Sequence, residues 1–495
     1  MRVCIIPAAG KGIRFRELGK LYPKCLLPYN NKPIIFHTIK NIQNIVDEIR
    51  IVVSHQSNEI KNFINFYNIK KIKIIKLNKN LPQGPAKSMY CGLKGNEKSV
   101  LMLLSDAIFN FNLTEIKSNW ISVMKVNDYK RWCIIDRKIN LYDKYEVKPP
   151  SNLAISGAYF FKDPKLLKKC CEEVFNKIDK KQEVQFSHVL NRYKIKQKIN
   201  LNLHPKNKIK DFGTLEEFLQ NKLSYKSRIF NKINEKNSIV YKSSTIYPNK
   251  VIKEAMWMSN LPSDIKHLAP KILNINILDG SYSMEKIVSP SLRDIFLFFD
   301  KSYDVWTKIF FQIGKFVDHC KKTEKKGFFW NQIIEKNHFR VKNEKEFLIN
   351  FDDKIRKNKH FNKISFFHGD LTFNNIFYDL QNDKLNFIDP MGDFYGHWLY
   401  DVSKLYQCVY GKYDYIDSNL YNSNGSNTIY YDKGDDPVKN AFNDIIFKKL
   451  TKKEKELVKL VATSLYLTMI PLHYHSKNNQ KLLYKQFLIL KDLLK

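Results

Sequence analysis

The octapeptide His368-Gly369-Asp370-Leu371-Thr372-Phe373-Asn374-Asn375 is the most informative segment of this chain, and the apolar run Lys384–Asp389 follows closely after it. An aspartate in a tight loop can accept the proton of an attacking hydroxyl, and an asparagine five residues later can direct its carboxamide oxygen toward a metal held near that aspartate. Asp389 ends a run typical of a short strand, and a strand end can hold a carboxylate against Mg²⁺. The three residues Asp370, Asn375 and Asp389 therefore predict a phosphoryl-transfer centre.

The complete pattern is His-Gly-Asp, an Asn five residues after the Asp, and a strand-ending Asp fourteen residues after that Asn. It resembles the catalytic and metal-binding loops of the aminoglycoside phosphotransferase and choline kinase family, whose members are relatives of protein kinases. The resemblance covers about the last half of the chain. It implies a two-lobed, protein-kinase-like α+β domain that uses ATP, with Asp370 as the catalytic base and with Asn375 and Asp389 as ligands of Mg²⁺.

Residues that could hold ATP lie upstream of this loop. Lys242 ends a run typical of a strand, and Glu254 follows in a helical stretch over 251–259, which is the order of the kinase Lys–Glu pair. Lys253 is an alternative for the lysine role, and no glycine-rich loop precedes either lysine. The segment 283–288, with Glu285 inside it, is interpreted as the hinge between the lobes, where adenine would bind.

The first half opens with the strand-like run Arg2–Pro7, which leads into Ala8-Ala9-Gly10-Lys11-Gly12-Ile13-Arg14-Phe15. Glycine has no Cβ, so Gly10 and Gly12 would let backbone N–H groups approach phosphates closely, and Arg14 adds a cation. Lys24 follows ten residues after Arg14 in the run Pro-Lys-Cys-Leu-Leu-Pro.

This combination resembles the signature of the sugar-phosphate nucleotidyltransferases, a family that also includes cytidylyltransferases for phosphocholine. The resemblance implies an α/β, Rossmann-like domain with a mixed, mostly parallel sheet, in which Arg14 and Lys24 contact the triphosphate and the transition state. Ile13 stands where the family often has Thr or Ser. Gln83 and Gly84 match the stretch that contacts the nucleobase, although a loop that caps a helix is an alternative.

The periodicity agrees with this expectation. Helical patterns over 33–45 and 58–67 alternate with strand patterns over 48–53 and 72–75, which is typical of a parallel sheet. In such sheets the ligand site lies beyond the carboxyl ends of the strands.

Two carboxylates complete the expected site. Asp106 ends the apolar run 100–106, and Asp211 opens the motif Asp-Phe-Gly-Thr-Leu-Glu. By the resemblance both bind Mg²⁺, which would offset the charge that builds up as a phosphate attacks the α-phosphate of a nucleoside triphosphate. The positions that match the family's acceptor site are Lys148, Asn152, Gly157 and Glu183, whereas Glu146 is one residue out of register.

Length and composition suit a globular chain of several domains. The 495 residues include 43% hydrophobic and 14% aromatic residues, enough for two or three cores. We place a nucleotidyltransferase domain at 1–222, a linker or the start of the small lobe at 223–235, and the kinase-like domain at 236–495.

The formal net charge of +35 is spread along the chain, so anionic small substrates are expected and nucleic acid is not. No apolar run reaches the roughly 18–20 residues of a membrane span, while peripheral association with an anionic membrane stays open. Eight scattered cysteines without metal-type spacing indicate reduced thiols and a cytoplasmic location. The oligomeric state is left open.

The pairing of the two halves predicts consecutive reactions. The C-terminal domain would phosphorylate a sugar or small alcohol with ATP, and the N-terminal domain would couple that phosphate to a nucleotide from an NTP, releasing pyrophosphate, for synthesis of a capsule or another surface polysaccharide. One alternative is a choline kinase joined to a phosphocholine cytidylyltransferase. Another is a nucleotidyltransferase with a non-catalytic, regulatory kinase-like domain.

Overall fold

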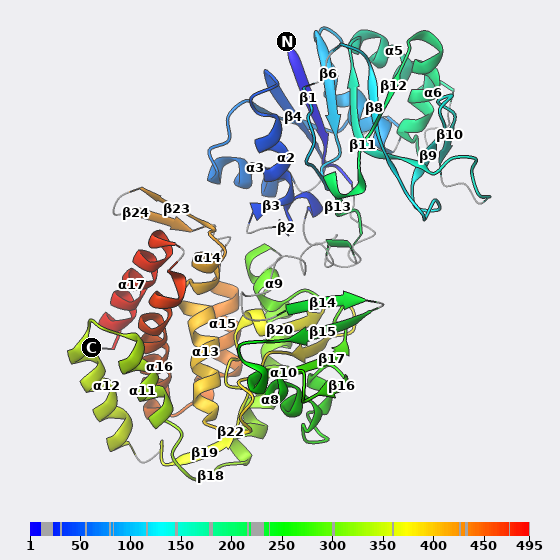
Figure 1. Cartoon of the computed structure of the whole chain (residues 1–495). Helices are drawn as coiled ribbons and strands as arrows, with labels where there is room; N and C mark the ends of the chain where they lie inside the picture. The colour runs from blue at the N-terminus through cyan, green and yellow to red at the C-terminus, as the bar shows by residue number, and fades with distance from the viewer. Residues whose placement is uncertain are drawn as a thin grey trace. The chain divides into compact units, whose positions relative to one another are not determined.

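The computed structural model describes the chain except for residues 11–22, 30–31, 55–56, 79–80, 83, 115–116, 144–146, 178–181, 215–216, 219–231, 237, 299–301, 359–360, 425–426, 431–433, 475 and 495. The chain divides into two compact units, Met1–Asn221 and Lys222–Lys495 (Figure 1). Most of the predicted linker therefore lies outside the described residues. None of the described helices is long and apolar enough to cross a bilayer.

The N-terminal unit is built on a nine-stranded mixed sheet. One part is parallel, in the order β6-β1-β4-β5. Its strands are β1 (Arg2–Pro7), β4 (Glu48–Val53), β5 (Ile72–Lys76) and β6 (Ser99–Leu103), and its helices are α2 (Ile34–Ile42), α3 (Ser57–Phe66) and α4 (Pro85–Gly92). The predicted alternation of strands and helices is confirmed, with α2 shorter than the expected helix.

The other part of the sheet is antiparallel around the long strand β11, which pairs with β6, β8 and β9. Its strands are β8 (Trp120–Lys125), β9 (Cys133–Ile135), β10 (Leu141–Asp143), β11 (Leu153–Phe161) and β12 (Asn200–Leu203), and its helices are α5 (Pro164–Phe175) and α6 (Phe186–Lys196). Strand β12 pairs with β8 in parallel, so six of the nine strands take part in a parallel pairing.

Burial of both faces explains why β1 is a continuous apolar run. Val3 and Ile5 lie in the core that side chains of α4, α5 and α6 also form, while Cys4 and Ile6 on the opposite face are equally buried. Beyond the sheet, β7 (Ala107–Phe109) pairs with β13 (Ile209–Asp211), a contact that joins two segments far apart in the sequence.

The C-terminal unit begins with a four-stranded antiparallel sheet of order β14-β15-β17-β16, packed against α8. These elements are β14 (Lys232–Lys236), β15 (Ile239–Ser243), α8 (Pro248–Ser259), β16 (Ile272–Asn276) and β17 (Ser281–Glu285). The strand and the helix predicted around Lys242 and Glu254 are confirmed.

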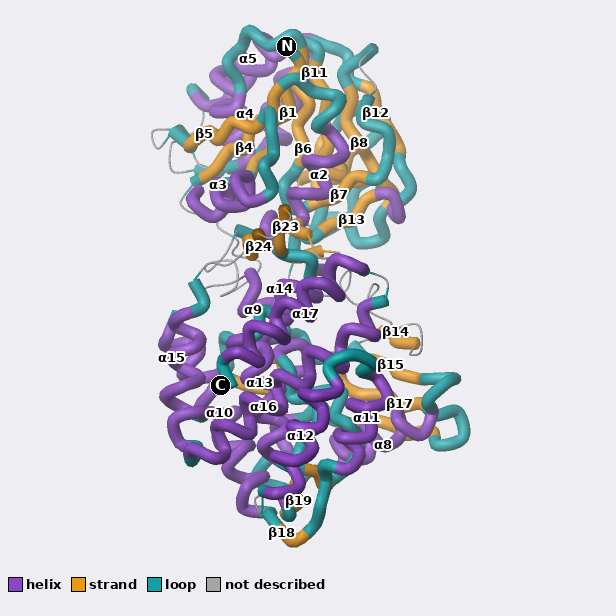
Figure 2. Tube along the Cα trace, turned by 90° about the vertical axis from the view of Figure 1, so that its left-hand side faces the viewer, coloured by secondary structure: helices purple, strands orange, loops and turns teal. Residues whose placement is uncertain are grey.

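The rest of this unit is mainly helical, and Figure 2 shows its helices packed along one another, with contacts of α10 with α15, α13 with α16, and α16 with α17. The helices are α9 (Leu292–Phe298), α10 (Tyr303–Lys322), α11 (Asn331–Arg340), α12 (Lys345–Lys357), α13 (Trp398–Tyr410), α15 (Asp436–Ile445), α16 (Lys452–Met469) and α17 (Lys477–Asp492). The α+β composition agrees with the prediction, and the kinase-like assignment stays a prediction.

The short strands β19 (Lys363–Phe366), β20 (Ile376–Asp379), β21 (Lys384–Phe387) and β22 (Tyr395–Gly396) surround the segment with the His-Gly-Asp motif. The polar region 411–436, which its length and composition suggest is an acceptor-binding lid or a disordered insertion, contains regular structure among its described residues. This region holds the helix α14 (Tyr413–Asp417) and a hairpin of β23 (Tyr421–Asn424) with β24 (Asn427–Tyr430), because its polar residues pair across two strands.

Candidate active sites

Lys242 is the centre of a buried ion-pair network in the C-terminal unit. Its Nζ atom lies 2.5 Å from Oε2 of Glu254 on α8 and 2.9 Å from Oδ1 of Asp389. Burial alone lowers the pKa of Lys242, but the charges of Asp389, Tyr282 and Glu254 outweigh it and raise the pKa above its ordinary value. The ammonium group of Lys242 therefore stays charged. Its two ion pairs connect β15 with α8 and with the segment that follows β21.

The alternative lysine occupies a different environment. The Lys253 side chain is 58% exposed and its Nζ atom lies 3.0 Å from Oδ1 of Asp393. A cavity of about 340 Å³ lies against the sheet, and Lys242, Tyr282 and Ser283 are among its lining residues. Glu285 is exposed and does not line this cavity, and its backbone N–H donates to the carbonyl of Lys271.

The Asp370 loop is held by short-range hydrogen bonds that explain the spacing of its motif. The Nδ2 atom of Asn375 donates to both the carbonyl oxygen and the Oδ2 atom of Asp370, each at 2.9 Å. The other carboxylate oxygen, Oδ1, lies 3.1 Å from Nζ of Lys404 on α13. Asp370 is 39% exposed, so its carboxylate is positioned on two sides and still accessible to a substrate.

A buried carboxylate fixes the start of this loop. The two oxygens of Asp401 accept hydrogen bonds from the backbone N–H groups of His368 and Gly369, both at 2.7 Å. Burial raises the pKa of Asp401 to about 7, and these two N–H groups act in the opposite direction. Asp401 thus braces the first two residues of the loop.

His368 is part of the framework and not of the chemistry. Its Nδ1 atom accepts a hydrogen bond from the backbone of Asp370, and its Nε2 atom lies 3.1 Å from the carbonyl of Ile388. Burial lowers the pKa of His368 to about 4, so the ring is neutral at physiological pH.

Asp389 is held beside the loop through backbone contacts on both of its sides. Ile388 N donates to the carbonyl of Asn375, and Met391 N donates to the carbonyl of His368. Asp389 itself has a φ of +53°, a left-handed conformation that is uncommon outside glycine. The structure thus brings Asp370, Asn375, Asp389 and Lys242 into one connected arrangement.

In the N-terminal unit, Lys24 and the two predicted metal carboxylates come together. Lys24 Nζ donates to Oδ2 of Asp106 in a short contact. Asp211 is adjacent because β13 pairs with β7, and Phe212 N donates to the carbonyl of Asp106 at 2.8 Å. A long-range strand pairing therefore aligns two carboxylates that lie more than a hundred residues apart in the sequence.

Arg131 is a member of this site that the sequence patterns did not reveal. Its guanidinium donates to Oδ2 of Asp211 and to both oxygens of Glu217. Burial raises the pKa of Asp211 to about 7, supported by the charges of Asp106 and Glu217 and opposed by Arg131. No motif spacing could have identified Arg131, because it follows β8 on a different segment from either aspartate.

Two predicted glycines have a steric reason to be glycine. Gly84 has a φ of +116°, and an added Cβ would lie 2.4 Å from the carbonyl oxygen of Val184. Gly157 has a φ of +93° at a bulge in β11, and its carbonyl accepts a hydrogen bond from Leu104 N. Gly84 caps α4, which also agrees with the helix-capping alternative.

The remaining predicted residues are less informative. Gly10 lies near Lys24, since a Cβ added to Gly10 would be 4.0 Å from Cε of Lys24. Three predicted acceptor residues are exposed: Lys148, Asn152 and Glu183. Four predicted or considered residues lie outside the described part of the chain: Gly12, Arg14, Gln83 and Glu146.

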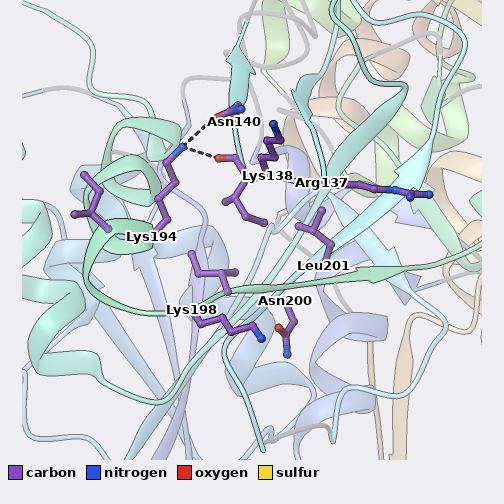
Figure 3. Close-up of a pocket in the computed structure, with 10 residues that line it drawn as sticks. Arg137, Lys138, Asn140, Lys194, Lys198, Asn200 and Leu201 are labelled. Carbon is purple, nitrogen blue, oxygen red and sulfur yellow. Dashed lines mark hydrogen bonds between the residues drawn. The ribbon is translucent and has the colours of Figure 1, made fainter.

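A separate basic cavity of about 860 Å³ lies between the β9–β10 turn, α6 and β12 (Figure 3). Its lining includes Arg137, Lys138, Lys194 and Lys198, and Lys194 Nζ donates to the carbonyl of Ile139 at 2.8 Å. None of the predicted site residues lines it.

Comparison with known proteins places a transferase domain in the first unit. Residues 4–114 match the model of the MobA-like NTP transferase domain. The bifunctional protein GlmU of Methanocaldococcus jannaschii is 27% identical over 164 residues, 32% of this chain and 39% of that protein. The low-salt glycan biosynthesis nucleotidyltransferase Agl11 of Haloferax volcanii is 24% identical over 174 residues, 32% of this chain and 48% of that protein.

The chain thus spans less than half the length of these two curated relatives. Among solved structures, a putative glucose-1-phosphate thymidylyltransferase from Bacillus anthracis matches with 18% identity and a TM-score of 0.40, over 47% of this chain and 98% of that one. The N-terminal unit accordingly contains a MobA-like NTP transferase domain with sugar nucleotidyltransferase relatives.

Proposed function

We propose that this protein catalyses two consecutive transfers, phosphorylation of a sugar or small alcohol by the C-terminal unit and nucleotidyl transfer to the resulting phosphate by the N-terminal unit. The observation that carries the proposal is that each unit holds its own set of paired carboxylates and lysines. In one unit Lys242 pairs with Asp389 and Lys404 with Asp370, and in the other Lys24 pairs with Asp106, which acts electrostatically on Asp211.

In the first reaction the acceptor hydroxyl attacks the γ-phosphorus of ATP. The bond between that phosphorus and the bridging oxygen breaks, ADP leaves, and the hydroxyl proton passes to Asp370. Lys242, held by Glu254, would contact the ATP phosphates, and Asn375 with Asp389 would hold Mg²⁺. The hydrogen bonds from Asn375 support this role of Asp370, because they orient its carboxylate before the substrate arrives.

In the second reaction a phosphate oxygen of that product attacks the α-phosphorus of an NTP. The bond to the bridging oxygen of the β-phosphate breaks and pyrophosphate leaves, giving an NDP-sugar or an NDP-linked alcohol. Lys24 would neutralise charge on the triphosphate, and Arg14 is proposed for the same role. The sugar nucleotidyltransferase relatives support a sugar phosphate as the acceptor, and the relative named for low-salt glycan biosynthesis supports a product used in glycan synthesis. We propose that this glycan is a surface polysaccharide.

The carboxylates of Asp106 and Asp211 form an environment that favours binding of a divalent cation. The raised pKa of Asp211 has its cause in burial and in the neighbouring carboxylates, an arrangement that a cation would relieve. The carboxylates of Asp106 and Asp211 would hold Mg²⁺, which prefers oxygen ligands, and the ion would offset the charge that develops in the transition state.

The experiment is to incubate the full chain with Mg²⁺, ATP, a second NTP and a panel of sugars, alditols, hydroxy acids and choline, and to measure ADP and pyrophosphate. We expect one acceptor to yield an NDP-linked product. Asp370→Asn should abolish product from the free acceptor but not from its phosphate ester, whereas Asp106→Asn should abolish both.

The same experiment separates the alternatives. Choline as the acceptor with CTP would establish the choline kinase and cytidylyltransferase pair. A different result would contradict the kinase assignment: the protein releases pyrophosphate when phosphate esters are supplied, but the wild type and Asp370→Asn release the same amount of ADP. That result would favour a regulatory C-terminal unit.

A further inference from the structure

Two helices of the C-terminal unit place cations around the catalytic carboxylate. Lys336 and Arg340 lie four residues apart on α11, and Tyr400 and Lys404 lie four residues apart on α13, so each pair shares one helix face. The helix starts are in contact, because the ring of Trp330 lies 6.2 Å from the ring of Tyr400.

The charges of these side chains act on one another. Lys404 Nζ lies 3.1 Å from Asp370 Oδ1 and 5.6 Å from the centre of the Tyr400 ring. Burial lowers the pKa of Lys336, the charges of Lys404 and Arg340 lower it further, and Asp370 raises it. The start of α11, the helix that carries Lys336, lies against α13, the helix that carries Lys404 and its ion pair with Asp370, and the electrostatic influence of both residues on Lys336 agrees with that placement.

The cations outnumber their counter-charges. Among the residues that the structure describes, Lys336 and Arg340 form no hydrogen bond or ion pair, and Lys404 forms its ion pair with Asp370. Exposed Lys250 on α8 adds a further positive charge felt at Lys336. Half-buried cations without a partner are unfavourable unless a ligand supplies the negative charge.

We propose that the alcohol phosphorylated at Asp370 is itself an anion, whose carboxylate or phosphate is bound by Lys336 and Arg340. This inference rests on the proposed kinase function and names its substrate class. A guanidinium binds a carboxylate or phosphate through two parallel N–H donors, and a lysine adds a compact charge. The hydroxyl to be phosphorylated would then face the oxygen atoms of Asp370.

This arrangement argues against choline as the acceptor. A quaternary ammonium bound next to Asp370 would lie among Lys336, Arg340 and Lys404, and like charges this close repel one another. Tyr400, the aromatic side chain on this face, already lies against the Lys404 ammonium.

The test compares acceptors that differ in one charged group. Glycerol is paired with glycerate and with glycerol 3-phosphate, glucitol with gluconate, and glucose with glucuronate and with glucose 6-phosphate; choline is included as a cation. For the full chain with ATP and Mg²⁺, we expect phosphorylation of an acidic member and not of its neutral partner. The carboxylate and phosphate arms identify which anion is recognised.

Two variants then test whether Lys336 and Arg340 on α11 bind the negative charge of the acceptor. Lys336→Met and Arg340→Gln should each raise the KM of the acidic acceptor roughly 10- to 100-fold, the range for losing a hydrogen bond to a charged group, without changing the KM of ATP. Exposed Lys345 on α12 provides the matched control, and Lys345→Met should change neither constant.

Three outcomes would overturn the inference. Equal use of neutral and acidic acceptors, or an unchanged acceptor KM in both variants, would overturn it while leaving the kinase function intact. A raised KM for ATP instead of the acceptor would assign the cations to the transferred phosphate. Identical ADP release by the wild type and by Asp370→Asn with every acceptor would overturn the kinase function together with this inference.

Discussion

The Nζ atom of Lys242 lies 2.5 Å from the Oε2 atom of Glu254, and both side chains are only 3% exposed. Removing one member of a buried ion pair leaves an uncompensated charge and typically costs about 3–5 kcal/mol. The same lysine contacts Asp389, so the pair links the sheet to the proposed metal ligand.

We therefore expect Lys242→Met to lower the kinase rate roughly 100-fold or more, because a preorganised charge at the transferred phosphate is lost. It should also lower the midpoint of thermal unfolding. Lys253→Met is the control, since the exposed pair of Lys253 with Asp393 should contribute about 1 kcal/mol or less. Equal losses of rate in the two variants would reassign the phosphate-binding role.

The second prediction concerns Arg131, which bridges Asp211 and Glu217. Arg131→Gln removes the cation from a group of carboxylates, so the thermal midpoint should fall and added Mg²⁺ should restore it more strongly than in the wild type. The measurement is the unfolding midpoint with and without Mg²⁺. Arg137→Gln, at an exposed arginine, should behave like the wild type. No Mg²⁺ effect in any of these proteins would contradict the metal site at Asp106 and Asp211.

The third prediction separates a steric clash from backbone strain. Gly369 has a φ of +84°, and an added Cβ would lie 2.4 Å from Cβ of Met391. Gly434 has a φ of +89°, and a Cβ added there would meet no atom within 4 Å among the residues that the structure describes. Gly434→Ala should therefore cost roughly 1–2 kcal/mol from its left-handed backbone alone. Gly369→Ala should cost more and should also abolish kinase activity, because it displaces the Asp370 loop. Urea unfolding measures both free energies, and equal values would show that the loop accommodates the methyl group.

The fourth prediction is a pH dependence of stability at Lys336. Burial, and then the charges of Lys404 and Arg340, lower its pKa from 10.5 to about 7. The pKa of Lys336 is lower in the folded than in the unfolded protein, so its protonation destabilises the fold. This destabilisation is complete below about pH 7 and decreases to zero as the pH rises to about 10.5.

Lys336→Met should consequently raise the thermal midpoint at about pH 6 and have little effect at about pH 10. The groups that face Lys336 are Lys404 and Asp370, Arg340 on its own helix, and Lys250 on α8. Midpoints measured across this pH range provide the test, with Lys345→Met as the control. A stabilisation that does not change with pH would show that packing, and not charge, is responsible.

Much of the architecture could be predicted from local patterns. Continuous apolar runs predicted β1 and β6, because strands buried on both faces contain few polar residues. The Asp370–Asn375 spacing predicted a compact loop, since one side chain bonds across a five-residue turn. The contacts that hold the loop are short in sequence, so the spacing of its residues records them.

The sequence by itself thus determined the strands, the helices and the motif residues of both candidate sites. Only the tertiary structure decided the partners that complete them: Arg131 beside Asp211 and Lys404 beside Asp370. These contacts join segments 34 to 80 residues apart, and electrostatic forces act through space without any fixed interval along the chain. The proposed preference for an anionic acceptor therefore depends on side chains that only the packing of the helices brings near one another.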